Sequence, residues 1–308
     1  MKRGTGNFSV QFRFLWRRLL RRGKFLLGHD PVFLPLFMRL TPLGTSREIT
    51  EHTDLVVEGF PRSGNTFTVF ALENAASYRL RIASHVHHPS QVKLAVSRGV
   101  PTMLVVREPV ATLSSYLAFG QHGRPASVLK EYSGYLRELV PYVDLVLICD
   151  FTEVVSNLSG VIDRFNDRFS TAIPHFDQSE ENVDRVFEEI ARQHRLMHRR
   201  QDPVHVAPRP SAGRHDISDR ARSGILDPRH EALLADALDL YDYFAAKASQ
   251  QKEIYLAGLA VPPPATNGRS SARRSSPLNG SRAPKRTAPT AARSKVVKSE
   301  DAPPPNLP

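Results

Sequence analysis

A loop rich in glycine has the residue types and the spacing that phosphate binding requires. It reads Gly59-Phe60-Pro61-Arg62-Ser63-Gly64-Asn65-Thr66. The spacing matches the phosphate-binding pattern G-x-x-x-x-G-K-[ST], except that Asn65 replaces the lysine. Gly64 allows a turn that points successive N–H groups at an anion, and a following helix adds its positive end. Arg62 is then the candidate cation, and a turn whose glycines serve only the fold is the alternative.

A second candidate anion site follows the apolar run over residues 102–106. Arg107 lies at the end of this run, and Ser115 lies eight residues further on. Eight residues are about two turns of the helix expected there. A fixed guanidinium and a hydroxyl at these places suit a second phosphate group. The alternative is an arginine that caps or pairs with Glu108 and a serine that only packs.

Three of the twelve histidines, His85, His87 and His88, fall within four residues after another apolar run. An imidazole, with an unperturbed pKa of about 6.5, accepts an alcohol proton near neutral pH. Two other interpretations stay open. One is a metal site, for which no cysteine or nearby carboxylate completes the ligand set. The other is a loop whose histidines orient a cofactor or a substrate.

The elements that must position these residues alternate along the chain. Apolar runs of strand type cover residues 55–59, 81–84, 102–106 and 145–149, and helical spacing covers 65–78, 91–97, 109–119, 126–140, 153–169, 182–198 and 227–247. This alternation predicts an α/β fold, a parallel sheet with helices on both faces in a P-loop-type three-layer architecture. Ligands of such sheets bind at the carboxyl ends of the strands, which directs attention to the loops after Gly59, Ser84 and Val106.

The positive charge lies at the two ends of the chain. The formal net charge is +11, but residues 1–30 hold eight Lys/Arg and one acid, and residues 261–308 hold nine Lys/Arg and two acids. The body between them is mildly acidic, so we expect no nucleic-acid partner. The single cysteine, Cys149, excludes a disulfide framework and a cysteine-rich zinc site, and it fits a reducing, cytoplasmic location.

We expect three parts: a basic amphipathic N-terminal segment (1–50), an α/β domain (51–258) and a disordered basic tail rich in Pro, Ser and Ala (259–308). The N-terminal segment has apolar residues at helical spacing with arginines between them. This pattern suits a helix on an anionic membrane surface. The other interpretation is a surface helix docked on its own domain, since many core-packing helices have a basic solvent face. No apolar run approaches the roughly 18 residues of a spanning helix.

Taken together, the two anion loops resemble the sulfotransferase family that uses 3′-phosphoadenosine 5′-phosphosulfate (PAPS). The segment Pro61-Arg62-Ser63-Gly64-Asn65-Thr66-Phe67 looks like the family's 5′-phosphosulfate loop. Arg107 and Ser115, with Glu108-Pro109 and Tyr116, look like its 3′-phosphate motif. The resemblance covers roughly residues 54–152. The family's late basic segment, which closes over the cofactor, has its nearest match in Ser211-Ala212-Gly213-Arg214.

The resemblance implies transfer of a sulfuryl group from PAPS, without a metal, to a hydroxyl of a carbohydrate, lipid or small-molecule acceptor. It also implies a general base, because the family has a histidine after a basic residue and a Thr/Ser. Ser84-His85 matches the last two, while Ala83 replaces the usual lysine, so His85 is the first candidate and His87 the second. An ATP-using P-loop kinase and a non-catalytic nucleotide-binding or scaffold protein are the alternatives. Asn65 and the Arg107–Ser115 pair argue against the kinase.

Overall fold

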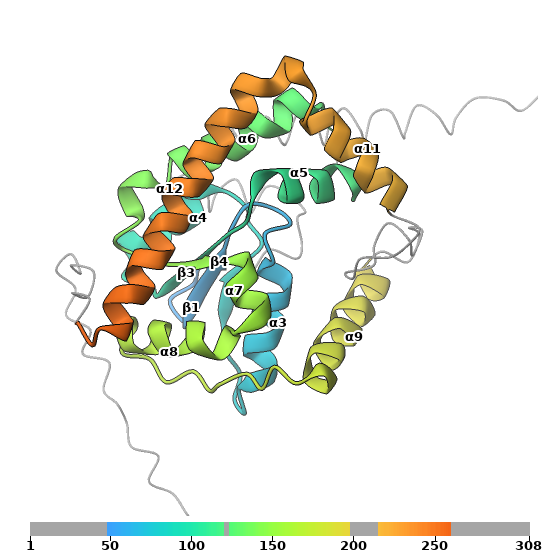
Figure 1. The fold of residues 1–308 in the computed structure, drawn as a ribbon. Helices are drawn as coiled ribbons and strands as arrows, with labels where there is room; N and C mark the ends of the chain where they lie inside the picture. The colour runs from blue at the N-terminus through green and yellow to red at the C-terminus, as the bar shows by residue number, and fades with distance from the viewer. Residues whose placement is uncertain (1–47, 120–122, 198–214, 260–308) are drawn as a thin grey trace, which may run out of the picture. The chain divides into compact units, whose positions relative to one another are not determined.

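Four short strands form a parallel sheet in the order β2-β1-β3-β4 (Figure 1). The computed structural model describes residues 48–119, 123–197 and 215–259. The strands are β1 (Leu55–Glu58), β2 (Ile82–Ser84), β3 (Thr102–Val106) and β4 (Leu147–Asp150). Val57 is paired with Ser84 and Val106 with Asp150, so all four strands end at the same edge of the sheet. The expected parallel sheet is confirmed, with β4 beginning two residues later than expected.

Helices connect and follow the strands. Their bounds are α3 (Asn65–Ala75), α4 (Pro89–Ser97), α5 (Pro109–Ala118), α6 (Pro125–Arg137), α7 (Phe151–Ser156), α8 (Leu158–Phe169), α9 (Glu180–Met197), α11 (His215–Ile225) and α12 (Glu231–Leu256), with 3₁₀ turns at Val140–Tyr142 and Pro228–His230. A proline opens α4, α5 and α6, at the position where the missing N–H has no intrahelical partner to lose. The proline therefore marks the first residue of each of these three helices.

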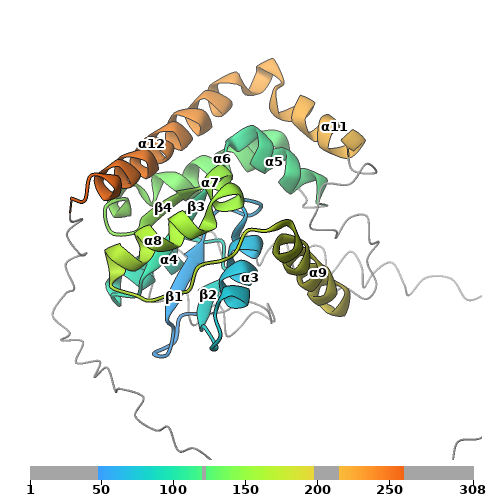
Figure 2. The ribbon, with the colours of Figure 1, turned by 60° about the horizontal axis from the view of Figure 1, so that its bottom comes forward.

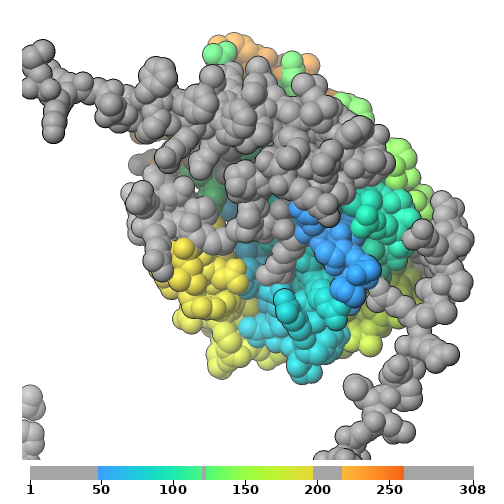
Figure 3. Space-filling model, turned by 180° about the vertical axis from the view of Figure 1, so that it is seen from behind, coloured from blue at the N-terminus to red at the C-terminus, as the bar shows by residue number. Residues whose placement is uncertain are grey.

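Helices cover both faces of the sheet (Figure 2). On one face, Val57, Val105 and Cys149 pack with residues of α3, α8 and α9. On the other, the neighbouring strand residues Leu104, Val106 and Ile148 pack with residues of α5, α6 and α12. Successive strand residues point to opposite faces, which is why the runs are apolar at every position rather than at alternate ones. In Figure 3 the yellow atoms of α9 adjoin the cyan region of α3 and β2, in agreement with the packing of α9 on α3.

Two helical features differ from the expected pattern, besides shifts at helix ends, of which the largest is at α12, which ends at Leu256 and not at residue 247. The single helix expected over 153–169 is two, because Asn157 has a φ of −153° and its side chain accepts the Gly160 N–H at 3.1 Å, which starts α8. Helix α11 was not expected, since its sequence is mostly polar. It packs on α5, and the buried Ile225 joins the apolar cluster of that face. Local sequence predicted neither feature, because a side-chain cap and a tertiary contact decide them.

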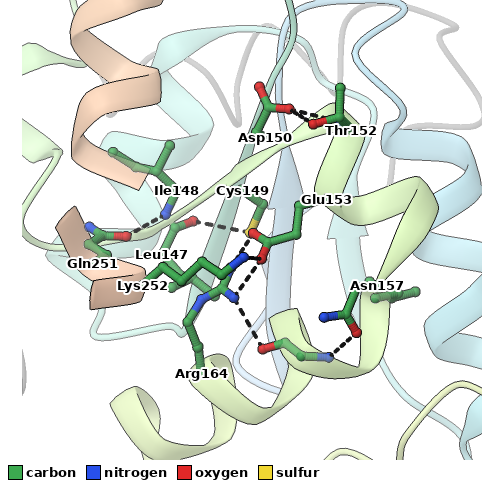
Figure 4. A network of polar contacts seen from close by, with 12 residues as sticks. Leu147, Ile148, Cys149, Asp150, Thr152, Glu153, Asn157, Arg164, Gln251 and Lys252 are labelled. Carbon is green, nitrogen blue, oxygen red and sulfur yellow. Dashed lines mark hydrogen bonds and ion pairs between the residues drawn. The ribbon is translucent and has the colours of Figure 1, made fainter. Parts of the chain in front are cut away.

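The outer edge of β4 is covered by α12 (Figure 4). The Ile148 N–H donates to Gln251 Oε1 at 2.9 Å, and Gln251 Nε2 donates to the carbonyls of Val143 and Val146 at 3.0 and 3.1 Å. Gln251 is buried, so its amide satisfies backbone groups that a strand edge would otherwise leave without partners.

A partly buried ion cluster joins α7, α8 and α12 beside this edge (Figure 4). Glu153 accepts from Arg164 Nη1 at 2.9 Å and from Arg164 Nη2 at 2.5 Å, and Lys252 Nζ lies 2.9 Å from its Oε1. Burial raises the pKa of Glu153, but the bonds from Arg164 and Lys252 outweigh this effect and hold the pKa below its ordinary value. The adjacent Cys149 thiol is fully buried, which raises its pKa to about 12. The cluster is thus a structural support, and the cysteine is not a nucleophile at neutral pH.

Several expectations concern segments outside the described residues. These are most of the N-terminal segment (1–47), the tail from residue 260, and the segment Ser211-Ala212-Gly213-Arg214. Within the described ranges, none of the helices combines the length and the apolar character that crossing a membrane requires.

Candidate functional site

The carboxyl ends of the four strands bring together the loops that the sequence singled out. We call residues 59–64 the glycine loop and residues 85–88 the histidine loop; they follow β1 and β2. Arg107 follows β3, and Phe151 follows β4. Hydrogen bonds and ring contacts described below join each of these segments to the glycine loop. The site is therefore built around the end of β1, one of the two central strands.

The glycine loop has a turn that requires glycine. Gly64 has a φ of +99° at the start of α3, and a Cβ there would lie 2.9 Å from the Phe151 ring. Arg62 also has a positive φ, 74°, which is uncommon for a residue with a side chain. The Ser63 N–H donates to the Phe60 carbonyl at 3.1 Å, which closes the turn. Strained backbone of this kind is typical of functional loops.

Asn65 stabilises the loop from within. Its Nδ2 donates to the carbonyls of Gly59 and Phe60 at 3.0 and 3.4 Å, and the residue is buried. The side chain at the position of the usual lysine therefore turns back on the loop. Ser63 Oγ is also buried, and it makes no hydrogen bond within the described structure. A buried hydroxyl in that state calls for an explanation, and a bound ligand is one.

Arg62 links the glycine loop to the second candidate motif. Its Nε donates to Ser115 Oγ at 3.0 Å, and its guanidinium lies 4.5 Å from the centre of the Phe119 ring. Ser115 and Phe119 come from α5 and its C-terminal end. The two segments that the sequence separates by about fifty residues thus meet in space. Ser115 contacts a cation here, which a residue that only packs does not do.

Arg107, which follows β3, also contacts the glycine loop. Its Nη1 donates to the Arg62 carbonyl at 2.9 Å, and its guanidinium lies 4.0 Å from the centre of the Phe151 ring. Burial lowers the pKa of Arg107, and the nearby Glu108 opposes this effect. An arginine stays protonated under such a shift, so a second cation faces the glycine loop.

The backbone around Arg107 is held firmly. The Arg107 carbonyl accepts from Tyr132 Oη at 2.7 Å and from Thr112 Oγ1 at 3.2 Å. Glu108 accepts the N–H groups of Val110 and Ala111 at 2.8 and 2.6 Å and thereby caps α5. The carboxylate expected as a possible partner of Arg107 therefore serves the helix start instead.

The three histidines have three different environments. His85 Nε2 lies 3.1 Å from Thr66 Oγ1 and its Nδ1 lies 2.7 Å from Ser84 Oγ. His87 Nδ1 lies 2.9 Å from the Gly59 carbonyl oxygen. His88 is buried and caps α4 by accepting the Ser90 N–H. His87 thus touches the glycine loop, His85 touches the first turn of α3 next to that loop, and His88 is a structural residue.

The side chain of Phe67 is not available for cofactor binding, although the family resemblance places Phe67 in the phosphosulfate loop. Its ring is buried and packs against Phe176 and Phe187, with ring centres 6.2 and 5.7 Å away. The side chain belongs to the core. What Phe67 can offer a ligand is its backbone N–H near the start of α3.

Sequence reasoning missed two residues of this site. Glu58, the last residue of β1, is fully buried and accepts N–H groups from the histidine loop. The Phe151 ring lies 4.0 Å from the Arg107 guanidinium and occupies the space that a Cβ at Gly64 would need. A signal existed for Glu58, since a charged residue in an otherwise apolar strand needs a specific partner. For Phe151 the sequence shows only that it follows a strand.

Two hollows on the described surface lie elsewhere. One of about 560 Å³ is lined by residues such as Thr50, Thr53, Tyr78 and Arg81, near the amino ends of β1 and β2. The other, of about 190 Å³, lies between α3 and α9. Neither is lined by the loops above, so the candidate site is defined by its converging groups and not by these hollows.

Across the three described ranges, no group of three or more His, Cys, Asp or Glu side chains is arranged to hold a metal ion.

A scan against protein-family models finds no match to this chain, and a search of curated proteins finds none either.

Proposed function

We propose that this chain binds PAPS at the carboxyl ends of β1, β2 and β3 and transfers its sulfuryl group to a hydroxyl of a carbohydrate, lipid or small-molecule acceptor. The observation that carries the proposal is the meeting of two anion motifs. Arg62 Nε contacts Ser115 Oγ at 3.0 Å, and Arg107 Nη1 contacts the Arg62 carbonyl at 2.9 Å. Two guanidinium groups and a hydroxyl thus lie beside a glycine loop at the start of a helix, an arrangement that suits a ligand with two separate phosphate groups.

Each group has a role in this proposal. Arg62 and the N–H groups of residues 64–67 hold the phosphosulfate and the negative charge that develops on the oxygen bridging phosphorus and sulfur. The Ser63 N–H is not among them, because it donates to the Phe60 carbonyl. Arg107 and Ser115 hold the 3′-phosphate, which ATP lacks. No metal is needed, because the arginine and the backbone amides supply the positive charge that magnesium supplies in kinases.

The transfer step assigns the proton to His85. The imidazole accepts the proton of the acceptor hydroxyl while the acceptor oxygen forms a bond to sulfur. The bond from sulfur to the bridging oxygen breaks, and adenosine 3′,5′-bisphosphate leaves with that electron pair. His85 is the first candidate because its Nε2 lies 3.1 Å from Thr66 Oγ1, within the segment proposed to hold the phosphosulfate. His87, whose Nδ1 lies 2.9 Å from the Gly59 carbonyl oxygen, is the second.

The P-loop kinase is the main rival. A kinase of this type uses the loop lysine on the β- and γ-phosphates. Here Asn65 is directed to the loop carbonyls, so the cation at that position is missing. The rival predicts binding of ATP with magnesium, and our proposal predicts binding of the bisphosphate.

A thermal-shift comparison separates these proposals. We expect adenosine 3′,5′-bisphosphate to raise the melting temperature, since a ligand at about 100 times its Kd stabilises a protein by about 2.7 kcal/mol. Stabilisation by ATP with magnesium, and not by the bisphosphate, would defeat the proposal.

If the bisphosphate binds, mass spectrometry of acceptor pools incubated with PAPS should show the sulfate mass gain. Binding without any such gain would favour a non-catalytic nucleotide-binding or scaffold protein.

Replacement of Arg107 by alanine tests the 3′-phosphate assignment. We expect bisphosphate binding to weaken by about 1.5–3 kcal/mol, the range for a hydrogen bond to a charged group. Titration calorimetry measures the change. Arg81→Ala is the control, because Arg81 is an exposed arginine just before β2 at the opposite edge of the sheet. Equal affinity in Arg107→Ala and the wild type would remove the assignment.

A further inference from the structure

The side chain of Glu58 joins the end of β1 to the histidine loop. Its Oε1 accepts the Val86 N–H at 2.8 Å, and its Oε2 accepts the His87 N–H at 3.1 Å. Gln91 Nε2, from α4, donates to the same Oε1 at 3.3 Å. Glu58 itself is 0% exposed. Three hydrogen bonds hold this buried carboxylate in one orientation, and they therefore fix the histidine loop relative to β1.

The histidine loop needs such a support. His85 has a φ of 64° and His87 a φ of 51°. Residues with a Cβ adopt this left-handed conformation rarely, and they keep it only when surrounding contacts hold it. The two N–H groups bound by Glu58 belong to Val86 and His87, the residues immediately after His85. The carboxyl thus holds the strained backbone from within.

The direction of the His85 ring depends on this backbone. The ring is contacted at both nitrogens, with Ser84 Oγ 2.7 Å from Nδ1 and Thr66 Oγ1 3.1 Å from Nε2. Ser84 belongs to β2, and Thr66 belongs to α3 next to the glycine loop. The ring can bridge these two elements only while the segment after it turns away toward β1, where Glu58 binds it.

We infer that Glu58 is a positioning residue, which holds His85 between Ser84 and Thr66 and acts on catalysis through His85 alone. The inference rests on the proposed function, because it assigns Glu58 to the same site. In this inference Glu58 of β1 supports the catalytic arrangement but does not itself contact PAPS or the acceptor. The neighbouring His87 ring has its Nδ1 3.9 Å from Glu58 Oε2 and 2.9 Å from the Gly59 carbonyl oxygen, so its direct ring contact is with the glycine loop.

The variant Glu58→Gln tests this inference. It keeps the shape of the side chain but replaces one acceptor oxygen by an NH₂ group, which cannot accept the second N–H. We expect kcat for sulfate transfer to fall about 10²-fold, the size that a misplaced catalytic group can cost, while the Kd for adenosine 3′,5′-bisphosphate stays unchanged. Asp54→Asn is the matched control, since Asp54 accepts the Arg81 N–H at 2.8 Å and joins the same two strands at their opposite ends. Equal losses of kcat in the two variants, or a parallel loss of bisphosphate affinity, would overturn the inference.

A double-mutant cycle decides whether Glu58 acts through His85. His85→Asn is the appropriate partner, because asparagine tolerates a positive φ and leaves the loop conformation accessible. In the His85→Asn background, Glu58→Gln should lower kcat no further. A second full loss of about 10²-fold would show that Glu58 acts by another route.

Two further measurements keep the inference testable if the first variant or the proposed function fails. If Glu58→Gln does not fold, Gln91→Met removes one donor to the carboxyl and should give a smaller loss of kcat at constant bisphosphate affinity. An unchanged kcat would contradict the inference.

If the wild type transfers no sulfate, the proposed function fails, and ¹⁵N NMR of the His85 ring decides the positioning role. The ring signals should shift in Glu58→Gln and not in Asp54→Asn, and unchanged signals in both would reject the role.

Discussion

The variant His85→Asn is expected to lower the turnover rate by about 10²- to 10⁴-fold, the usual loss when a general base is removed. Bisphosphate affinity should barely change, because the imidazole acts on the acceptor and not on the phosphates. Asparagine is preferred to alanine, since His85 has a φ of 64° that asparagine adopts more readily. Steady-state kinetics with PAPS and an acceptor that the wild type sulfates measure the effect. The wild type should lose activity at acid pH as the imidazole is protonated, and the variant should lack this limb.

His87→Asn is the matched control, because His87 has a φ of 51° and lies in the same loop. Its Nδ1 lies near the Gly59 carbonyl oxygen, so we expect turnover to be reduced much less than in His85→Asn. If His87→Asn is the inactive variant and His85→Asn stays active, the base is His87. If both variants retain near-normal turnover, neither histidine is the base, while the cofactor assignment stands.

The variant Gly59→Ala is expected to destabilise the whole fold. A Cβ at Gly59 would lie 2.3 Å from the Val105 carbonyl oxygen and 2.8 Å from Asn65 Oδ1. Val105 belongs to β3, so relief of the clash requires the two central strands to separate. Overpacking of this kind costs about 1–3 kcal/mol and occasionally more, and we expect the upper end because the clash is with backbone. Urea denaturation measures the free energy of unfolding.

Gly224→Ala provides the comparison for Gly59→Ala. Gly224 lies within α11, and an added Cβ would meet the Pro125 side chain at 3.2 Å. Alanine is favoured over glycine in a helix by about 1 kcal/mol, which offsets the close contact. We expect a stability change within about 1 kcal/mol of zero. If Gly59→Ala is as stable as Gly224→Ala, the close approach of Gly59 to Val105 is not present in solution.

The sequence predicted the sheet because strands buried on both faces are continuous apolar runs. Val105 and Val106 illustrate this pattern, since both are buried and they belong to the apolar clusters on opposite faces of the sheet. Val57 and Val56 are likewise both buried and belong to different clusters. The break at Asn157 and the position of α11 were not predicted. A capping side chain decides the first, and packing against α5 decides the second. Periodicity carries no information on either.

The site was predicted as a set of residues, but its contacts were not. Strand order and register decide which loops lie next to one another, and neither could be predicted from the apolar pattern of the sequence. The Arg62–Ser115 contact joins residues 53 positions apart, and the Glu58–Val86 contact joins residues 28 apart. Asn65 shows a further limit. Its type suggested a replaced lysine, whereas its hydrogen bonds to the Gly59 and Phe60 carbonyls give it a structural role.

The bond between β4 and α12 has a consequence for synthesis of the chain on the ribosome. Ile148 and Gln251 are 103 residues apart. At translation rates of about 5–20 residues per second, Gln251 follows Ile148 by roughly 5–20 s. Until then the nascent sheet has an open strand edge, and the apolar cluster lacks Phe244 and Ala248 of α12. Open strand edges pair with other chains, so we expect the nascent chain to be most prone to intermolecular association before α12 has been made.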